Sequence, residues 1–273
     1  MTAADLAARI PDGALIGLPP DYSLPSMAVI RQLILQRRRG LKLLGVPVLG
    51  LCADLLIGAG CVAEIETAAV TLGEFGIAPC FTRASLAGSI KVVDSTCPAI
   101  HAGLQAAEKD VPFLPLRGVL GSDLVKHRPD WRIVDNPMPP HSDEGGGDPI
   151  LLVPAIRPDI ALFHAPMADR EGNVWIGRQR ELVTMAHAAE RTIVTVEKIH
   201  DGNLLSDPAL AAGTLPGFYV ESVAVVERGC WPLPLPEHYA WDAEHLKEYV
   251  TLAASDEGFA KYLDKYVHER QAA

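Results

Sequence analysis

The chain has 273 residues, about half of them apolar, and its 24 Lys and Arg against 34 Asp and Glu leave a net charge of −10. A chain of this length forms one large α/β domain or two small ones, and either can bury a substantial core. The acidic balance argues against nucleic acid or an anionic membrane as a general partner, because a negative surface repels both. A small ligand that carries phosphate stays compatible with this charge.

The cysteines are odd in number, widely spaced and free of any Cys-x-x-Cys pair. This pattern predicts reduced thiols in a cytoplasmic protein, without a disulfide framework or a zinc site. The first ten residues lack the basic start and long apolar run of a secretory signal, so we expect none. No apolar stretch reaches the roughly 18 residues of a membrane span. The cysteines are Cys52, Cys61, Cys80, Cys97 and Cys230.

The first strong pattern is an apolar run at 14–16, followed by a proline-containing loop and by helical spacing from Ser26 onward. It predicts a buried strand, a stiff loop and a helix, since Pro19 and Pro20 fix the backbone and remove two amide donors. Open α/β folds bind ligands at the carboxyl ends of their strands, although a plain connector fits the same residues. The candidates for substrate contact are Gly17, Leu18 and Pro19.

The region 41–51 reads as an apolar strand region broken by Pro47, and 54–63 then matches Gly-x-Gly-x-x-Ala. This match raises a nicotinamide-dinucleotide site as a competing interpretation. The fingerprint needs a helix after its glycines, whereas 62–72 alternates in the manner of a strand. No acidic residue ends a second strand about 20 positions further on.

A strand at 90–93 leads to Cys97 and then to a helix at 98–109 that begins with Pro98. A thiol near a helix amino terminus has a lowered pKa and can act as a nucleophile. The alternative is a small buried cysteine without chemistry. Cys97 is therefore the candidate reactive group of the chain.

Several loops complete the first half. The tight turn at 74–79 and the glycine-containing loop at 117–123, which follows a strand at 113–116, can bring backbone groups close to a ligand or be plain turns. The Pro- and Gly-rich stretch 135–149 predicts a mobile surface loop within a single domain over 1–273. The candidates for substrate contact here are Glu74, Gly118, Gly121 and Ser122.

The second half predicts strands at 150–153, 159–164, 174–176 and 192–196, and a helix at 181–189. His164 falls at a strand's end, where it is either a catalytic histidine or a hydrogen-bonded core residue. Two helices close the chain, the second capped by Ser255. Their aromatic stripe is expected to form core or a subunit contact, and it consists of Tyr249, Phe259, Tyr262 and Tyr266.

Collinear segments of the chain resemble the alpha subunit of family I coenzyme A transferases, from about Asp12 to Tyr239. The branch is the alpha subunit of the glutaconate type, together with the related steroid-ring CoA hydrolases. The resemblance implies a three-layer α/β/α fold with a mostly parallel sheet, and a complex with a similar beta subunit. The segments are 54–60, 73–79, 103–107 with 112–115, 154–164 and 168–173.

The resemblance also implies roles for residues. In these transferases the nucleophile is a glutamate, usually on the beta subunit, which becomes a glutamyl-CoA thioester, while the alpha subunit contributes the loop after its first strand. Here Gly17 is kept, but Leu18 and two prolines replace the permissive residues, and prolines donate no amide to an oxyanion. The hydrolase branch has a catalytic glutamate just before the helix at 98–109, where this chain has Cys97 and no glutamate.

We therefore predict the alpha subunit of a CoA-transferase that acts on an acyl-CoA and a carboxylic acid, with coenzyme A as substrate and no tightly bound cofactor or metal. The catalytic glutamate is expected on the beta subunit. A CoA-thioester hydrolase of the same fold, a non-catalytic assembly subunit and a homo-oligomer that has lost activity are the alternatives. Neither nucleic acid nor a membrane is expected as a partner.

Overall fold

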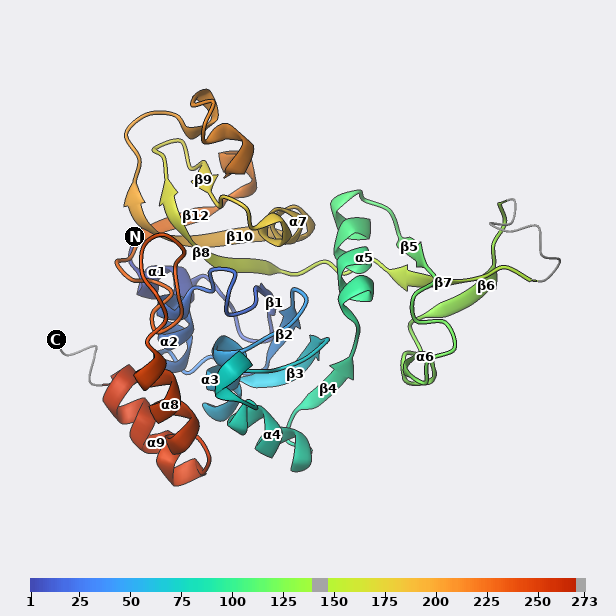
Figure 1. Ribbon diagram of the computed structural model, residues 1–273, viewed down its shortest axis with the longest axis horizontal. Helices are drawn as coiled ribbons and strands as arrows, with labels where there is room; N and C mark the ends of the chain where they lie inside the picture. The colour runs from blue at the N-terminus through green and yellow to red at the C-terminus, as the bar shows by residue number, and fades with distance from the viewer. Residues whose placement is uncertain (139–146, 269–273) are drawn as a thin grey trace.

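The computed structural model describes residues 1–138 and 147–268 (Figure 1). Nine strands in these ranges form one sheet in the order β11-β9-β8-β1-β2-β3-β4, with β10 beside β8 and β12 beside β10. Within the described residues, the pairings in this sheet are parallel except those of β9, which pairs antiparallel with β8 and with β11. The strands are β1 (Leu15–Leu18), β2 (Leu41–Gly45), β3 (Val62–Thr67), β4 (Lys91–Asp94), β8 (Ile160–Ala168), β9 (Val174–Trp175), β10 (Arg191–Ile199), β11 (Thr214–Leu215) and β12 (Ser222–Val225).

Helices cover both faces of the sheet. The chain moves in one direction from β1 to β4 and in the other from β8 to β12, so right-handed crossovers place their helices on opposite faces. Helices α2, α3 and α4 pack in succession, and α5 packs against α7 on the other side (Figure 1). The helices are α1 (Ala3–Ala8), α2 (Met27–Leu35), α3 (Leu51–Gly58), α4 (Pro79–Leu86), α5 (Cys97–Glu108), α7 (Arg180–Ala188), α8 (Ala243–Leu252) and α9 (Asp256–Leu263).

The sheet reverses its winding between β1 and β8, which pair in parallel. From this pair the chain winds outward to β4 on one side and to β12 on the other. A crevice for ligands forms at such a switch point, outside the carboxyl ends of the strands. The loop after β1, which the sequence predicted at the carboxyl end of a buried strand, lies at this point.

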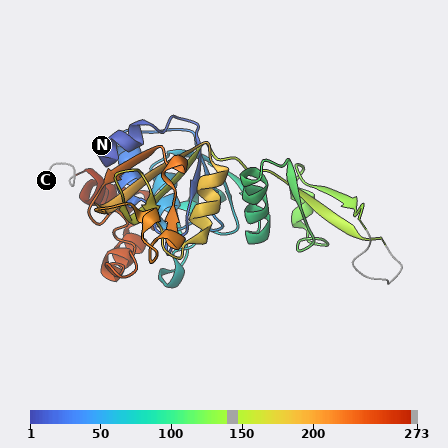
Figure 2. The ribbon, with the colours of Figure 1, turned by 90° about the horizontal axis from the view of Figure 1, so that it is seen from above.

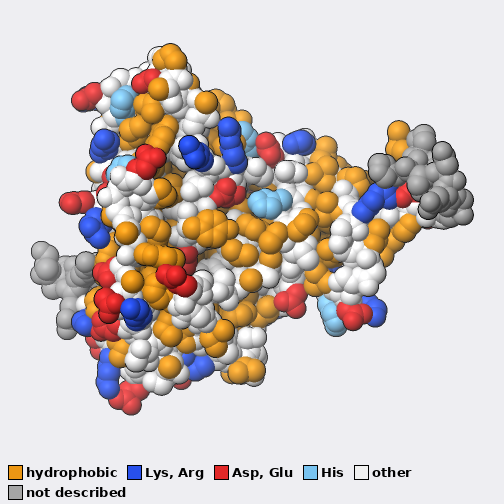
Figure 3. Space-filling model, viewed as in Figure 1, with side chains coloured by type: hydrophobic (Ala, Val, Ile, Leu, Met, Phe, Trp, Pro, Cys, Tyr) orange, Lys and Arg blue, Asp and Glu red, His pale blue; other side chains and the backbone are white. Residues whose placement is uncertain are grey.

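A second, smaller sheet projects from the body as an arm (Figures 1 and 2). Its antiparallel strands are β5 (Phe113–Leu116), β7 (Pro149–Pro154) and β6 (Arg132–Asp135), and α6 (Leu124–His127) lies between β5 and β6. The arm has a small hydrophobic core, separate from that of the body, in which the start of α5 packs against Trp131, Leu151 and Val153. Figure 3 shows hydrophobic side chains along the arm, where Phe113 and Ile133 are exposed.

The stretch 135–149, predicted as a mobile loop, connects β6 to β7. Its described ends are ordered as part of the arm, because Asp135 pairs with Pro149 and the amide of Asn136 donates to the carbonyl of Asp148 over 2.9 Å. Residues 139–146 lie outside the described residues.

The structure decides three interpretations of the sequence. The strand region 41–51 is broken near Pro47 as expected, since β2 ends at Gly45, but its last residue, Leu51, already begins α3. The structure confirms the argument against a dinucleotide site: Gly58 ends α3, Gly60 follows it, and the strand β3 comes next, whereas the fingerprint requires a strand before its glycines and a helix after them. His164 lies in the middle of β8 and not at its end, since the strand continues to Ala168.

The carboxyl-terminal helices pack on the body as expected. Ser255 caps α9 by accepting a hydrogen bond from the amide of Gly258 over 3.1 Å. Tyr249 and Tyr262 are fully buried, which confirms the prediction of an aromatic core. No helix within 1–138 and 147–268 is both long and apolar enough to cross a bilayer.

Candidate functional site

Helix α7 lies directly on β1 because position 17 has no side chain. A Cβ atom on Gly17 would sit 3.2 Å from both Cγ and Sδ of Met185, and 3.5 Å from Cγ of Pro158. The approach to Met185 is tighter than ordinary van der Waals contact. Gly17 therefore acts in packing: it allows α7 to approach the strand and bring its first turn to the loop that follows β1.

Two side chains fasten the first turn of α7 to that loop. The side-chain amide of Gln179 donates a hydrogen bond to the carbonyl of Tyr22 over 3.3 Å. The hydroxyl of the buried Ser23 donates to the carboxylate of Glu181. These bonds fix the positions of Arg180 and Tyr22 relative to each other.

A cavity of about 420 Å³ lies between this loop, the loop after β2 and helices α5 and α7. Every element that lines it comes from the carboxyl edge of the sheet, at the switch point between β1 and β8. Its polar groups include a phenol, an imidazole, a guanidinium and a carboxylate. The lining residues are Pro20, Tyr22, Val46, Pro47, His101, Gln105, Arg180, Glu181 and Thr184.

Cys97 lies near this cavity, as the first residue of α5. Its thiol is exposed, whereas the other four cysteines are buried. Thr96 caps the helix by accepting a hydrogen bond from the amide of Ala99. Cys97 lies one turn before His101, which lines the cavity, and partial burial raises the pKa of Tyr22 on the facing loop.

A second cavity, of about 200 Å³, lies on the other side of the same loop. Its walls are mostly apolar, and the rings of Phe75 and Trp241 meet edge to face at its rim with centroids 5.2 Å apart. Both carboxyl oxygens of Asp21 lie 3.0 Å from the amide nitrogen of Leu51, at the start of α3. Burial raises the pKa of Asp21 to about 7, although the Leu51 amide opposes this shift.

His164 belongs to a buried network farther along the sheet. Its Nδ1 lies 2.8 Å from the hydroxyl of Thr195, and its Nε2 lies 2.9 Å from the carboxylate of Glu197. Burial lowers the pKa of His164 despite the nearby carboxylate, which favours the neutral form of the ring. Glu197 also accepts hydrogen bonds from the Tyr239 hydroxyl and the Arg228 amide. Fully buried and hydrogen-bonded, His164 fits the core alternative.

The structure brings together only some of the residues that the sequence singled out. Gly17, Leu18 and Pro19 are buried at the end of β1, directly before Pro20, which lines the larger cavity, and Cys97 begins the helix whose His101 lines it. Glu74 is exposed on the turn Gly73–Phe75, which borders the smaller cavity. Gly118, Gly121 and Ser122 are exposed in the arm, between β5 and α6.

None of the candidate residues chosen from the sequence lines the larger cavity, and the side chains that sequence reasoning missed there include Tyr22, His101, Arg180 and Glu181. Tyr22 had a local signal, because it follows the two prolines at the end of a strand. The others lie on two helices that only the three-dimensional winding brings together. Among the described residues, no group of three or more His, Cys, Asp or Glu could hold a metal ion.

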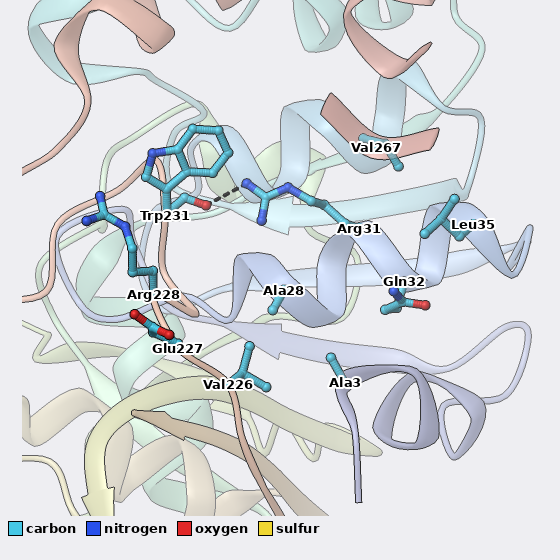
Figure 4. Close-up of a pocket in the computed structure, with 10 residues that line it drawn as sticks. All are labelled: Ala3, Ala28, Arg31, Gln32, Leu35, Val226, Glu227, Arg228, Trp231 and Val267. Carbon is cyan, nitrogen blue, oxygen red and sulfur yellow. Dashed lines mark hydrogen bonds between the residues drawn. The ribbon is translucent and has the colours of Figure 1, made fainter. Parts of the chain in front are cut away.

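Another cavity, of about 440 Å³, lies against α2 and away from these residues (Figure 4). Its two arginines are engaged within the protein. Arg31 donates to the carbonyl of Trp231 and lies 5.0 Å from the centre of the Trp231 ring, while Arg228 lies 4.9 Å from the centre of the Tyr239 ring. No residue of the loop after β1 or of α5 lines this cavity, whereas Pro20 and Tyr22 of that loop and His101 of α5 line the cavity of about 420 Å³. We therefore take the cavity of about 420 Å³ at the switch point as the candidate site.

The chain belongs to the coenzyme A transferase family, whose profile matches residues 1–226. It is 33% identical to an uncharacterized protein of Archaeoglobus fulgidus over 89% of this chain, and it spans about half, 53%, of that protein's length. It is 29% identical to the A subunit of 3-oxoadipate CoA-transferase from Pseudomonas knackmussii, over 94% of this chain and 88% of the relative.

Solved structures agree with this assignment. Glutaconate coenzyme A-transferase from Acidaminococcus fermentans superposes with a TM-score of 0.87 at 26% identity, over 98% of this chain and 88% of that chain. A variant of the decarboxylase AibA/AibB superposes with a TM-score of 0.79 at 28% identity, over 97% of both chains. The predicted family, the α/β fold with its mostly parallel sheet and the likeness to the alpha subunit are thus confirmed.

Proposed function

We propose that this chain is the alpha subunit of a heteromeric CoA-transferase that moves coenzyme A between an acyl-CoA and a carboxylic acid. The observation that carries this proposal is the lining of the larger cavity. Within the described residues, its one carboxylate is Glu181, which the Ser23 hydroxyl already engages. A covalent transfer needs a carboxylate nucleophile, so we assign that group to a glutamate of a beta subunit that faces this cavity.

The proposed reaction has four balanced steps. In the first step the glutamate attacks the acyl-CoA carbonyl, which forms a mixed anhydride between the glutamate and the acyl group and releases the CoA thiolate. The thiolate then attacks the glutamyl carbonyl, which releases the first acid and forms a glutamyl-CoA thioester. In the third step the acceptor carboxylate attacks the glutamyl carbonyl of this thioester, which forms a second mixed anhydride and releases the CoA thiolate. In the fourth step the thiolate attacks the acceptor's carbonyl in this anhydride, which yields the new acyl-CoA and the free glutamate.

This chain would supply the groups around the reacting carbonyl. Pro19 and Pro20 carry no N–H, but the amides of Asp21 and Tyr22 have no acceptor within the described part of the chain. Successive amides in a turn form a cradle for an anion, and the carbonyl of Pro20 closes this turn with the amide of Ser23 over 2.8 Å. We assign these two amides to the developing oxyanion and Cys97 to the surroundings of the acyl group, while the buried Gly17, Leu18 and Pro19 hold the loop that carries the amides.

Two further features support the proposal. The exposed apolar side chains of the arm, among them Phe113 and Ile133, offer a surface for a second protein chain. The five cysteines are all free, which fits the reducing cytoplasm as the place of assembly.

The test is to purify the tagged chain from its host and to measure the native mass of what comes with it. We expect a second chain of similar size in equal amount, and CoA exchange between acyl-CoAs and acids by the complex. Release of free CoA without an acceptor acid would indicate a hydrolase instead. A chain that is alone, or bound only to itself, would contradict the two-subunit proposal.

A further inference from the structure

We propose that Arg180 is the anion-binding residue of the larger cavity and binds either the second carboxylate of a dicarboxylic substrate or the 3′-phosphate of coenzyme A. This inference rests on the proposed function, since it assigns a specificity-determining residue to the same site. Carboxylate and phosphate share the chemistry that matters here, because both present two oxygens to the fork of a guanidinium.

Arg180 is well placed to meet a ligand. It is the first residue of α7, and its side chain lines both the 420 Å³ cavity and an adjoining one of about 290 Å³. The residues on either side of it, Gln179 and Glu181, are bonded to Tyr22 and Ser23. The backbone that carries the guanidinium is therefore held at the loop where the reacting carbonyl is proposed to lie.

The guanidinium of Arg180 is also free to bind. Within the described residues, Arg180 makes no side-chain hydrogen bond and no ion pair, although Glu181 is its neighbour in the chain and lines the same cavity. Glu181 is instead engaged by Ser23, so its charge is not directed at the arginine. By contrast, the arginines of the cavity in Figure 4 are engaged by Trp231 and Tyr239.

The other polar groups of the site favour an anion as well. His101 and Gln105 reach the same cavity from α5, and Thr184 lies one turn beyond Arg180 on α7. These side chains can donate hydrogen bonds. An anion that enters between the helices therefore meets the permanent positive charge of Arg180 and several further hydrogen-bond donors. The single opposing carboxylate among the described lining residues, Glu181, is already bonded.

The experiment compares Arg180→Met with Arg180→Lys and with the control Arg178→Met in the purified two-subunit complex. Arg178 lies two positions earlier and lines neither cavity. Transfer kinetics are measured with glutarate and pentanoate as acceptors, which have the same number of carbons but differ in one carboxylate. Each acceptor is tested with donors made from CoA and from dephospho-CoA.

If Arg180 binds the second carboxylate, Arg180→Met should lower kcat/KM for glutarate by tenfold or more and change that for pentanoate less than twofold. If it binds the CoA phosphate, the tenfold loss should occur with both acids and disappear with dephospho-CoA donors. In either case Arg180→Lys should recover part of the loss, and Arg178→Met should behave as the wild type. Losses of less than twofold in all pairs, or equal losses in all of them, would overturn the assignment.

Failure of the proposed function has a different signature, because the wild-type complex would then transfer no CoA to either acid. Calorimetric titration of the chain with glutarate, pentanoate and CoA keeps the Arg180 assignment testable in that case. We expect glutarate or CoA to bind the wild type at least tenfold more tightly than Arg180→Met. Equal affinities of both proteins for all three compounds would overturn the assignment.

Discussion

A Cβ atom on Gly17 would lie 3.2 Å from the side chain of Met185, so β1 and α7 touch at a position that glycine alone leaves open. The candidate site depends on this contact, because the close packing of α7 on β1 positions Arg180 and Glu181 beside the loop after β1. The geometry of the site thus depends on a packing contact between residues that are far apart in the chain.

We expect Gly17→Ala to push α7 away from β1. Overpacking of a buried contact costs about 1 to 3 kcal/mol in the free energy of unfolding, and a displaced α7 should also raise KM. Gly118→Ala is the control for stability, since a Cβ atom at Gly118 meets nothing within 4 Å. Chemical denaturation of both variants measures the difference. Equal stability of Gly17→Ala and the wild type would show that Met185 yields without cost.

Asp21 should make the protein less stable as pH rises from acid to neutral. Burial raises its pKa from 3.8 to about 7, so the folded chain keeps a proton that the unfolded chain releases. The stabilisation is complete below about pH 3.8 and is lost as pH approaches 7. Asp21→Asn keeps an oxygen for the Leu51 amide but cannot ionise.

Urea unfolding at several pH values tests this. The stability of Asp21→Asn relative to the wild type should increase between pH 4 and pH 8. The exposed Asp201, as Asp201→Asn, should show no such trend. A constant difference for Asp21→Asn would mean that Asp21 is ionised in the folded protein throughout this range.

Glu197 should have the opposite effect at lower pH. Burial by itself would raise its pKa, but hydrogen bonds from His164, the Arg228 amide and the Tyr239 hydroxyl outweigh it and lower the pKa from 4.5 to about 2. Its stabilisation is therefore present above about pH 4.5 and lost as pH falls toward 2. The advantage of the wild type over Glu197→Gln should shrink in that window. An advantage that stays constant from pH 6 to pH 3 would contradict the hydrogen-bonded network.

Cys97 should be the one thiol of the native chain that reagents reach. It is exposed, whereas Cys52, Cys61, Cys80 and Cys230 are buried. We expect iodoacetamide to add one group per native chain and five per unfolded chain, as read by mass spectrometry. If the thiol touches substrate, Cys97→Ser should change turnover of the complex by tenfold or more, about 1.4 kcal/mol in the activation barrier. Unchanged kinetics would leave Cys97 without a role in the site.

Much of the fold could be predicted from local patterns. The buried run at 14–16, the alternation after Val62 and the capping Ser255 each specify an element through neighbours in the chain, and β1, β3 and α9 form as expected. Local patterns do not always distinguish a strand from a helix, as the segment that ends at Leu51 shows. A short apolar run fits a buried strand as well as a buried helix, and α3 forms where the strand region was expected to end.

The site was less predictable, because its parts meet only through the winding of the sheet. The sequence pointed to the loop after β1 and to Cys97, and the structure places both at or near the larger cavity. It gave no sign of Arg180 or His101, which lie on α7 and α5. Polar residues in the first turns of helices are ordinary, and nothing local shows which helices will face each other.

The division of the active site between two chains is tested most directly by locating the glutamyl-CoA thioester. The purified complex is incubated with an acyl-CoA, the thioester is trapped with hydroxylamine as a hydroxamate, and both chains are digested and mapped by mass spectrometry. We predict the modified glutamate on the beta subunit and none on this chain. A hydroxamate on this chain, at Glu181 or at any other carboxylate, would show that the chain carries its own nucleophile and would contradict the proposed division.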